Sequence, residues 1–145
     1  MSLETWKAEF YPTPAAEFAP NPCGAPPDLL GAVQHSIQKW EGLRSVNLQE
    51  HGAKVDEFRV GALYFNGQGL YVGGDTGCAL CHASPRGCRS CAWAKAHGES
   101  CEIRYEAVRR AHIQGGDEDA AITLMIEGLR EVEAFLIRAG APEES

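Results

Sequence analysis

Two Cys-x-x-Cys pairs separated by six residues constrain the folding of this chain more than any other feature. The pairs are Cys78-Ala-Leu-Cys81 and Cys88-Arg-Ser-Cys91, and a further cysteine, Cys101, follows them. Each pair can place two thiolates on one edge of a tetrahedron if the residues between them form a tight knuckle. Two pairs together supply the four soft ligands that Zn²⁺ prefers. The pattern therefore predicts one structural zinc ion.

The spacing leaves the choice of ligands among these five cysteines open. The simplest set is Cys78, Cys81, Cys88 and Cys91; a competing set combines Cys78 and Cys81 with Cys101 and one cysteine of the second pair. In both sets thiolates fill every coordination position, which is typical of structural rather than catalytic zinc. The sequence contains no His-Glu-x-x-His motif and no Gly-rich phosphate loop. We therefore expect a protein that is not an enzyme.

The same thiols would also suit two iron cofactors. The run Cys78-Ala-Leu-Cys81-His82 matches the attachment motif of c-type haem, with His82 as one axial ligand and Met125 as a candidate for the other. An iron–sulfur cluster is chemically open to the same thiolates. Haem attachment normally takes place outside the cytoplasm and would leave the second Cys-x-x-Cys pair without a role. A redox protein is thus an alternative to the zinc protein.

The N-terminal residues and the hydropathy of the chain indicate the cellular compartment of the protein. Residues 1–6 have neither the basic nor the apolar region of a signal peptide. No apolar run approaches the roughly 18 residues that span a bilayer. We therefore expect a cytoplasmic protein without membrane contact. Thiols stay reduced in the cytoplasm, which favours metal binding over disulfides.

The cysteine segment is a basic island in an acidic chain. The net charge is −7, yet residues 78–98 contain Arg86, Arg89 and Lys95 and no acid. We expect these bases to offset the negative charge of the metal site, and Trp93 to cover it with apolar surface. Alternatively, the three bases could bind nucleic acid, with Trp93 as a stacking surface. The acidic chain argues against non-specific binding to nucleic acid, so a protein is the expected partner.

The remaining patterns predict an α+β fold: a single, mainly helical small domain of residues 1–145, with a β-hairpin that leads into a zinc-knuckle-like site. We expect a Pro-rich extended segment over residues 1–27 and a helix plus hairpin over 28–77. A metal-binding module over 78–101 and C-terminal helices over 102–139 follow. Apolar residues at helical spacing predict helices over 27–42 and 118–139. The turn Asn66-Gly67 predicts a hairpin of strands 58–65 and 70–73.

Individual side chains in these elements carry further expectations. Cys23 is expected to be half-buried rather than a ligand, and His35 to lie at the surface because it is off the apolar stripe of its helix. Within short helices over 92–112, the residues expected to face inward are Ile103, Ala107, Val108 and Ala111.

Residues 35–106 resemble small uncharacterised cysteine-rich proteins encoded by bacteriophages and prophages. The likeness is carried by His35-Ser36-Ile37-Gln38-Lys39-Trp40-Glu41-Gly42-Leu43, Asn47-Leu48, His51-Gly52, the cysteines with Gly98-x-x-Cys101, and Tyr105-Glu106. In those proteins Pro-Leu usually follows the second pair, whereas Ala92-Trp93 stands here. The resemblance implies a phage context and a five-cysteine site that includes Cys101, and it implies no mechanism. We expect a small phage-type protein with a structural zinc site that binds a host or phage protein.

Overall fold

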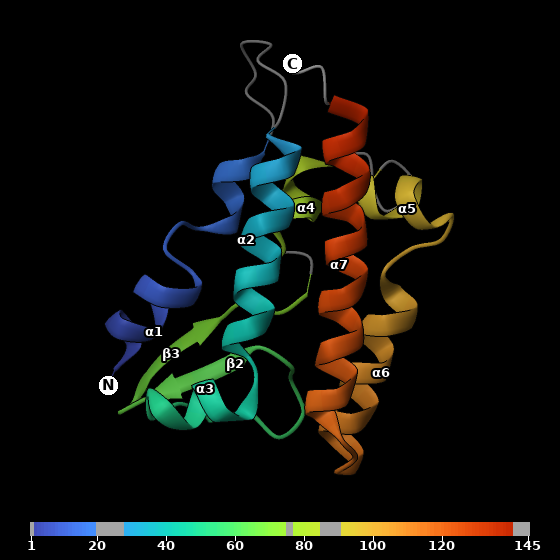
Figure 1. The fold of residues 1–145 in the computed structure, drawn as a ribbon. Helices are drawn as coiled ribbons and strands as arrows, with labels where there is room; N and C mark the ends of the chain where they lie inside the picture. The colour runs from blue at the N-terminus through green and yellow to red at the C-terminus, as the bar shows by residue number, and fades with distance from the viewer. Residues whose placement is uncertain (1, 20–27, 75–76, 85–90, 141–145) are drawn as a thin grey trace.

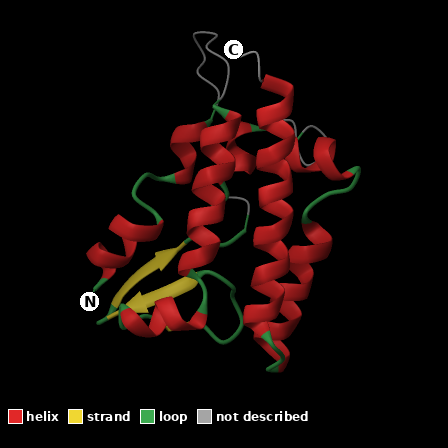
Figure 2. Ribbon diagram, in the orientation of Figure 1, coloured by secondary structure: helices red, strands yellow, loops and turns green. Residues whose placement is uncertain are grey.

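The computed structural model describes residues 2–19, 28–74, 77–84 and 91–140. Within them the chain forms seven α-helices, a short 3₁₀ helix and one three-stranded sheet. Helix predominates, and the sheet lies at one corner beneath the helices (Figure 2). The α+β class predicted from the sequence is confirmed. No helix in these ranges has both the length and the apolar character needed to cross a bilayer.

Two long helices form the centre of the fold and run side by side (Figure 1). Helix α2 spans Leu29–Gly42 and α7 spans Glu118–Gly140, which confirms the two strongest helix predictions. The carboxylate of Asp28 caps α2 by accepting from the Gly31 N–H at 2.8 Å. The apolar stripe of α7 is buried from residue 122 to residue 132. Apolar spacing alone thus identified the pair of helices around which the rest is packed.

The N-terminal segment is helical, so the predicted extended segment over 1–27 is wrong for the residues described. Helix α1 spans Leu3–Phe10 and the 3₁₀ helix η1 spans Ala15–Phe18. A capping box between Ser2 and Thr5 begins α1. Trp6 is fully buried and donates its indole N–H to the Gly42 carbonyl at 2.9 Å. The aromatic residues of this segment are therefore part of the core, where they cover α2.

The sheet is a hairpin with one short additional strand. Strands β1 (Lys54–Val55), β2 (Ala62–Phe65) and β3 (Gln68–Tyr71) pair antiparallel in that order, after the short helix α3 (Ser45–Glu50). The predicted turn is confirmed, with positive φ at Asn66 and Gly67. The first hairpin strand begins later than predicted. The Asp56 carboxylate accepts from the backbone N–H groups of residues 58 and 59, which makes a turn there instead.

Three further helices follow the sheet: α4 (Ala79–Ala83), α5 (Ala92–His97) and α6 (Glu102–Gln114). The expectation for α6 was partly wrong, because Ile103 is 62% exposed and Ala107 is also exposed, whereas Val108 is fully buried. The surface position predicted for His35 was wrong as well. Its ring is buried between Tyr11 and Phe18, and one ring nitrogen lies within hydrogen-bond distance of the Thr13 carbonyl.

Candidate metal centre

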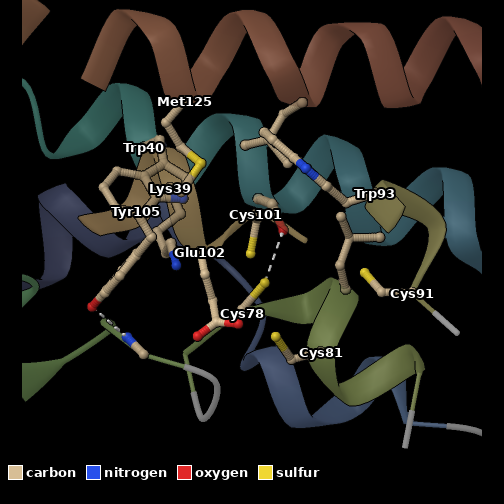
Figure 3. Close-up of a pocket in the computed structure, with 14 residues that line it drawn as sticks. Lys39, Trp40, Cys78, Cys81, Cys91, Trp93, Cys101, Glu102, Tyr105 and Met125 are labelled. Atoms are coloured by element: carbon tan, nitrogen blue, oxygen red, sulfur yellow. Dashed lines mark hydrogen bonds between the residues drawn. The ribbon is translucent and has the colours of Figure 1, made fainter. Parts of the chain in front are cut away.

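Four cysteines from three successive helices line one cavity. The cavity has a volume of about 230 Å³ and is bordered by α2, by the first residues of α4, α5 and α6, and by α7. Its cysteines are Cys78, Cys81, Cys91 and Cys101. Figure 3 shows them entering this region from separate elements, with aromatic side chains around them. The fold therefore gathers the first Cys-x-x-Cys pair, Cys91 and Cys101 around one cavity.

The first pair is held in helical rather than knuckle conformation. Cys78 is the N-cap residue of α4 and Cys81 lies within that helix, so the three-residue spacing puts both thiols on one side of a turn. Gly77 directly precedes Cys78 and packs against the backbone of Val72, which follows the last strand of the sheet. A Cβ at Gly77 would lie 2.1 Å from the Val72 carbonyl oxygen, so no larger residue fits there. The close backbone approach thus fixes where Cys78 begins the helix.

The other two described cysteines hold comparable positions at helix starts. Cys91 is the N-cap residue of α5 and is buried, and Cys101 is the N-cap residue of α6 and is half-buried. The nearby thiols of Cys78, Cys101 and Cys91 all raise the pKa of the Cys81 thiol. The four cysteines therefore reach one cavity from the starts of three different helices.

The thiols of Cys78 and Cys81 have opposite protonation preferences. A hydrogen bond from Cys81 holds the pKa of Cys78 well below its usual range. The Lys39 ammonium and the Ser36 hydroxyl also lower this pKa, whereas burial raises it. The same hydrogen bond raises the pKa of Cys81, together with burial and the nearby thiols. The pair therefore favours one thiolate and one thiol, and the thiolate is the form that binds a metal.

Lys39 is a buried cation in the wall of this cavity, and sequence analysis did not single it out. Its side chain is 1% exposed, and the ammonium donates to the Gly77 carbonyl at 3.2 Å. It also lies 5.0 Å from the centre of the Trp40 ring. One signal was available in the sequence, because Lys39 belongs to the stretch that carries the resemblance to phage proteins.

Aromatic side chains close the remaining sides of the cavity. Trp93 is almost fully buried, stacks on His97 and lines the cavity. On the opposite side, the Tyr105 hydroxyl accepts from the Gly74 N–H at 3.1 Å, and its ring meets Trp40 edge-on. Because Trp93 is buried, it does not offer the stacking face that the nucleic-acid alternative requires.

Several residues predicted for the site lie elsewhere or cannot be placed. Lys95 is exposed on α5 and does not border the cavity, and His82 is half-buried in α4 without lining it. Four residues named in the sequence analysis lie outside the described ranges: Cys23, Arg86, Cys88 and Arg89. Within the described ranges, no three Cys, His, Asp or Glu side chains are arranged to hold a single metal ion. The thiols thus surround a common space rather than forming a closed tetrahedron.

Comparisons with known proteins add no assignment to this geometry. No protein-family model matches the chain, and neither the curated proteins nor the solved structures compared with it include a match.

Proposed function

We propose that the four cavity cysteines hold a structural metal ion, zinc, and that the protein acts by binding another protein. The observation that supports the metal most directly is the convergence of Cys78, Cys81, Cys91 and Cys101 on one cavity, whose wall also includes the buried Lys39. Four thiolates with Zn²⁺ would carry a net charge of −2, and a buried cation is the group that such a site needs nearby. Closed thiolate sites stabilise folds rather than catalyse reactions.

Metal removal tests this part of the proposal. Structural zinc contributes directly to folding free energy, so a chelator should lower the melting temperature, and Zn²⁺ but not Mg²⁺ should restore it. Circular dichroism during heating provides the measurement. An unchanged melting temperature after complete metal removal would contradict a structural metal.

The outer face of the sheet is the surface that best fits a protein partner. Tyr64 and Tyr71 lie on the same face because Tyr71 pairs with Ala62, two residues before Tyr64. They are 44% and 40% exposed, and the guanidinium of Arg59 lies 4.4 Å from the centre of the Tyr71 ring. Next to Arg59, Phe58 is 68% exposed. Tyr and Arg are enriched in the energetic centres of protein interfaces.

Site-specific photo-cross-linking tests this surface. A cross-linking amino acid at Tyr64 should capture a discrete protein from bacterial lysate after nuclease treatment. The same amino acid at Val46, which is 65% exposed on α3, should not capture that protein. The double variant Tyr64→Ser and Tyr71→Ser should abolish association with the captured protein in a purified binding assay. Equal capture at both positions, or capture that disappears with nuclease, would contradict the proposal.

An iron–sulfur cluster is the second candidate, and the size of the cavity favours it. About 230 Å³ exceeds the roughly 150 Å³ cavity that accommodates benzene in another protein, so the site has room for a polyatomic group. Cys thiolates are the usual ligands of such clusters. Haem receives less support, because the cavity is smaller than the roughly 300 Å³ at which pockets for drug-sized ligands begin. Purification without oxygen distinguishes zinc from a cluster, since only the cluster absorbs visible light.

A further inference from the structure

Strand β3 forms an open edge of the sheet. It lies beside β2, and no described strand pairs with its other side (Figure 1). Hydrogen bonds alternate along an antiparallel ladder, and the Val72 N–H donates to the Gly61 carbonyl at 2.8 Å. The same alternation makes Leu70 bond to β2, whereas Gly69 and Tyr71 direct their N–H and C=O groups away from it. Gly69 is exposed, and because glycine has no side chain, the exposed surface belongs to the backbone itself.

The two edges of the sheet differ in their protection against pairing with another strand. At the opposite edge, β1 is two residues long and includes a lysine, Lys54. Short strands and charged side chains are usual devices that keep a sheet edge from pairing. Strand β3 has neither a charge nor a proline over Gln68–Tyr71, so its outward donors and acceptors form a ready template for a further strand.

The sequence of β3 is complementary to itself. If two copies pair antiparallel with Leu70 opposite Leu70 of the second copy, Gly69 of each copy lies opposite Tyr71 of the other. The outward groups of Gly69 and Tyr71 then form hydrogen bonds between the copies. The Tyr71 ring of the second copy covers Gly69 beside Tyr64, whose ring lies 3.6 Å from the position of a Cβ at Gly69. Leu70 packs on its counterpart, on the sheet face where its β2 neighbour Leu63 is buried.

We propose that the protein forms a two-fold symmetric dimer in which the β3 strands of two copies pair antiparallel and join their three-stranded sheets into one. The pairing brings no like charges together within the strands, because β3 is uncharged. It places Tyr64 of each copy beside Tyr71 of the other, so the two outer faces form one continuous aromatic surface. This inference goes beyond the partner binding proposed above and does not depend on the metal centre.

Substitutions at Gly69 test the pairing, because they either remove or keep its outward N–H. Gly69→Pro lacks the N–H but leaves the bonds to β2 intact, since proline is accepted where the N–H of an edge strand faces solvent. Gly69→Ala is the matched control: it keeps the N–H, and its Cβ would make only ordinary contacts in the monomer.

Sedimentation velocity of the full-length, reduced protein measures the association from about 1 µM to about 1 mM, the range expected of a small interface. We expect the wild type to dimerise as its concentration rises. Association of Gly69→Ala should stay within about threefold of the wild type. Association of Gly69→Pro should be weaker by about tenfold or more, because each copy loses one hydrogen bond of the interface.

Hydrogen exchange of the wild type provides a second measurement that needs no variant. Protection of the Gly69 and Tyr71 amides should increase as the concentration rises, because dimerisation gives both amides an acceptor. The Leu70 amide bonds to β2 within one copy, so its protection should not depend on concentration. This measurement decides the question if Gly69→Pro fails to fold.

Each outcome separates the dimer from the partner binding proposed above. A wild type that stays monomeric at about 1 mM would overturn the dimer, even if a cross-linking amino acid at Tyr64 captures a lysate protein. Equal dimerisation of Gly69→Pro and Gly69→Ala, or protection of Gly69 and Tyr71 that ignores concentration, would place the contact on another surface and overturn the inference. A dimer that Gly69→Pro alone abolishes supports the inference, even if no lysate protein is captured.

Discussion

The six-membered ring of Trp93 packs directly on the backbone of Gly128, at a point where α7 has no side chain. A Cβ at Gly128 would lie 2.1 Å from the nearest carbon of that ring. One turn later in α5, a ring nitrogen of His97 lies 3.0 Å from the Gly128 carbonyl oxygen. Helix α5 is therefore fixed to α7 at a glycine, and this contact sets the position of Cys91 at the start of α5.

The variant Gly128→Ala should be less stable than the wild type by about 1–3 kcal/mol, because the added methyl group displaces Trp93 from the cavity wall. Alanine favours a helix by up to about 1 kcal/mol relative to glycine, so the clash must exceed that gain. Urea unfolding measures the difference. Gly116→Ala is the control, since the nearest atom to its Cβ would lie 3.5 Å away, an ordinary contact distance. Equal stability of the two variants would show that the Trp93 contact is not restrictive.

His112 should make folding stability depend on pH near neutrality. Burial alone lowers the pKa of His112, but hydrogen bonds to the Asp56 carbonyl and the Glu118 carboxylate outweigh it and raise the pKa. Both ring nitrogens face acceptors, so only the doubly protonated ring can donate to both. The stabilisation is complete below the unfolded pKa of about 6.5 and is lost as pH rises through the raised folded value.

Measurement of unfolding free energy from pH 5 to pH 8 tests this linkage. The advantage of the wild type over His112→Gln should be largest at the acidic end and should decrease as the ring loses its proton. Subtracting the unfolding free energy of His112→Gln from that of the wild type at each pH removes the contributions of the other histidines. Parallel curves across the whole range would contradict the raised pKa.

Loss of a cavity thiol should remove the metal and unfold the surrounding region. We expect Cys78→Ser, Cys81→Ser or Cys101→Ser to lose bound zinc and more than about 4 kcal/mol of stability, since metal-ligand energy is folding energy in a small site. Hydrogen exchange should show loss of protection over residues 70–101. Cys23→Ser is the control because it lies outside the cysteine cluster in the sequence. A Cys78→Ser protein with wild-type zinc content and melting temperature would contradict the proposed site.

Trp6 should anchor the N-terminal helix to the core. We expect Trp6→Ala to cost about 3–5 kcal/mol, because the indole is fully buried and its N–H bonds to the Gly42 carbonyl. Leu124→Ala is the control, since that leucine is 50% exposed on α7 and should have little effect. Thermal unfolding distinguishes the two. A Trp6→Ala protein as stable as the control would show that α1 contributes little to the fold.

The sequence predicted those elements whose structure depends on local pattern. The stripe of α7 repeats over several turns, and Asn66-Gly67 demands a positive φ, so both could be identified without tertiary information. Helix α1 was missed because it is short and precedes a Pro-rich stretch that dominates the composition of the segment. Its local signals were the Ser2–Thr5 capping pair and the helical spacing of Leu3, Trp6 and Phe10, and the helix is held by burial of Trp6 against α2.

The candidate site, like the fold, could be predicted from the sequence only in part. Regular spacing in the sequence identified the cysteines, and the fold brings four of them to one cavity. Lys39 could not be identified by pattern, because a lysine on a helix is ordinarily exposed and only tertiary packing buries this one. The roles expected of Ile103 and His35 failed for the same reason. Which face of a helix is covered depends on neighbours that are distant in the sequence.

The central claim is that the four cavity cysteines bind a structural zinc ion. The most direct test is elemental analysis, combined with an absorption spectrum, of protein purified without added metal. The account predicts about one zinc per chain and no visible absorption band, because Zn²⁺ has a filled d shell. Iron with a visible band would contradict the zinc assignment and make the protein an iron–sulfur or haem protein. Absence of any bound metal in reduced protein would contradict the metal centre itself.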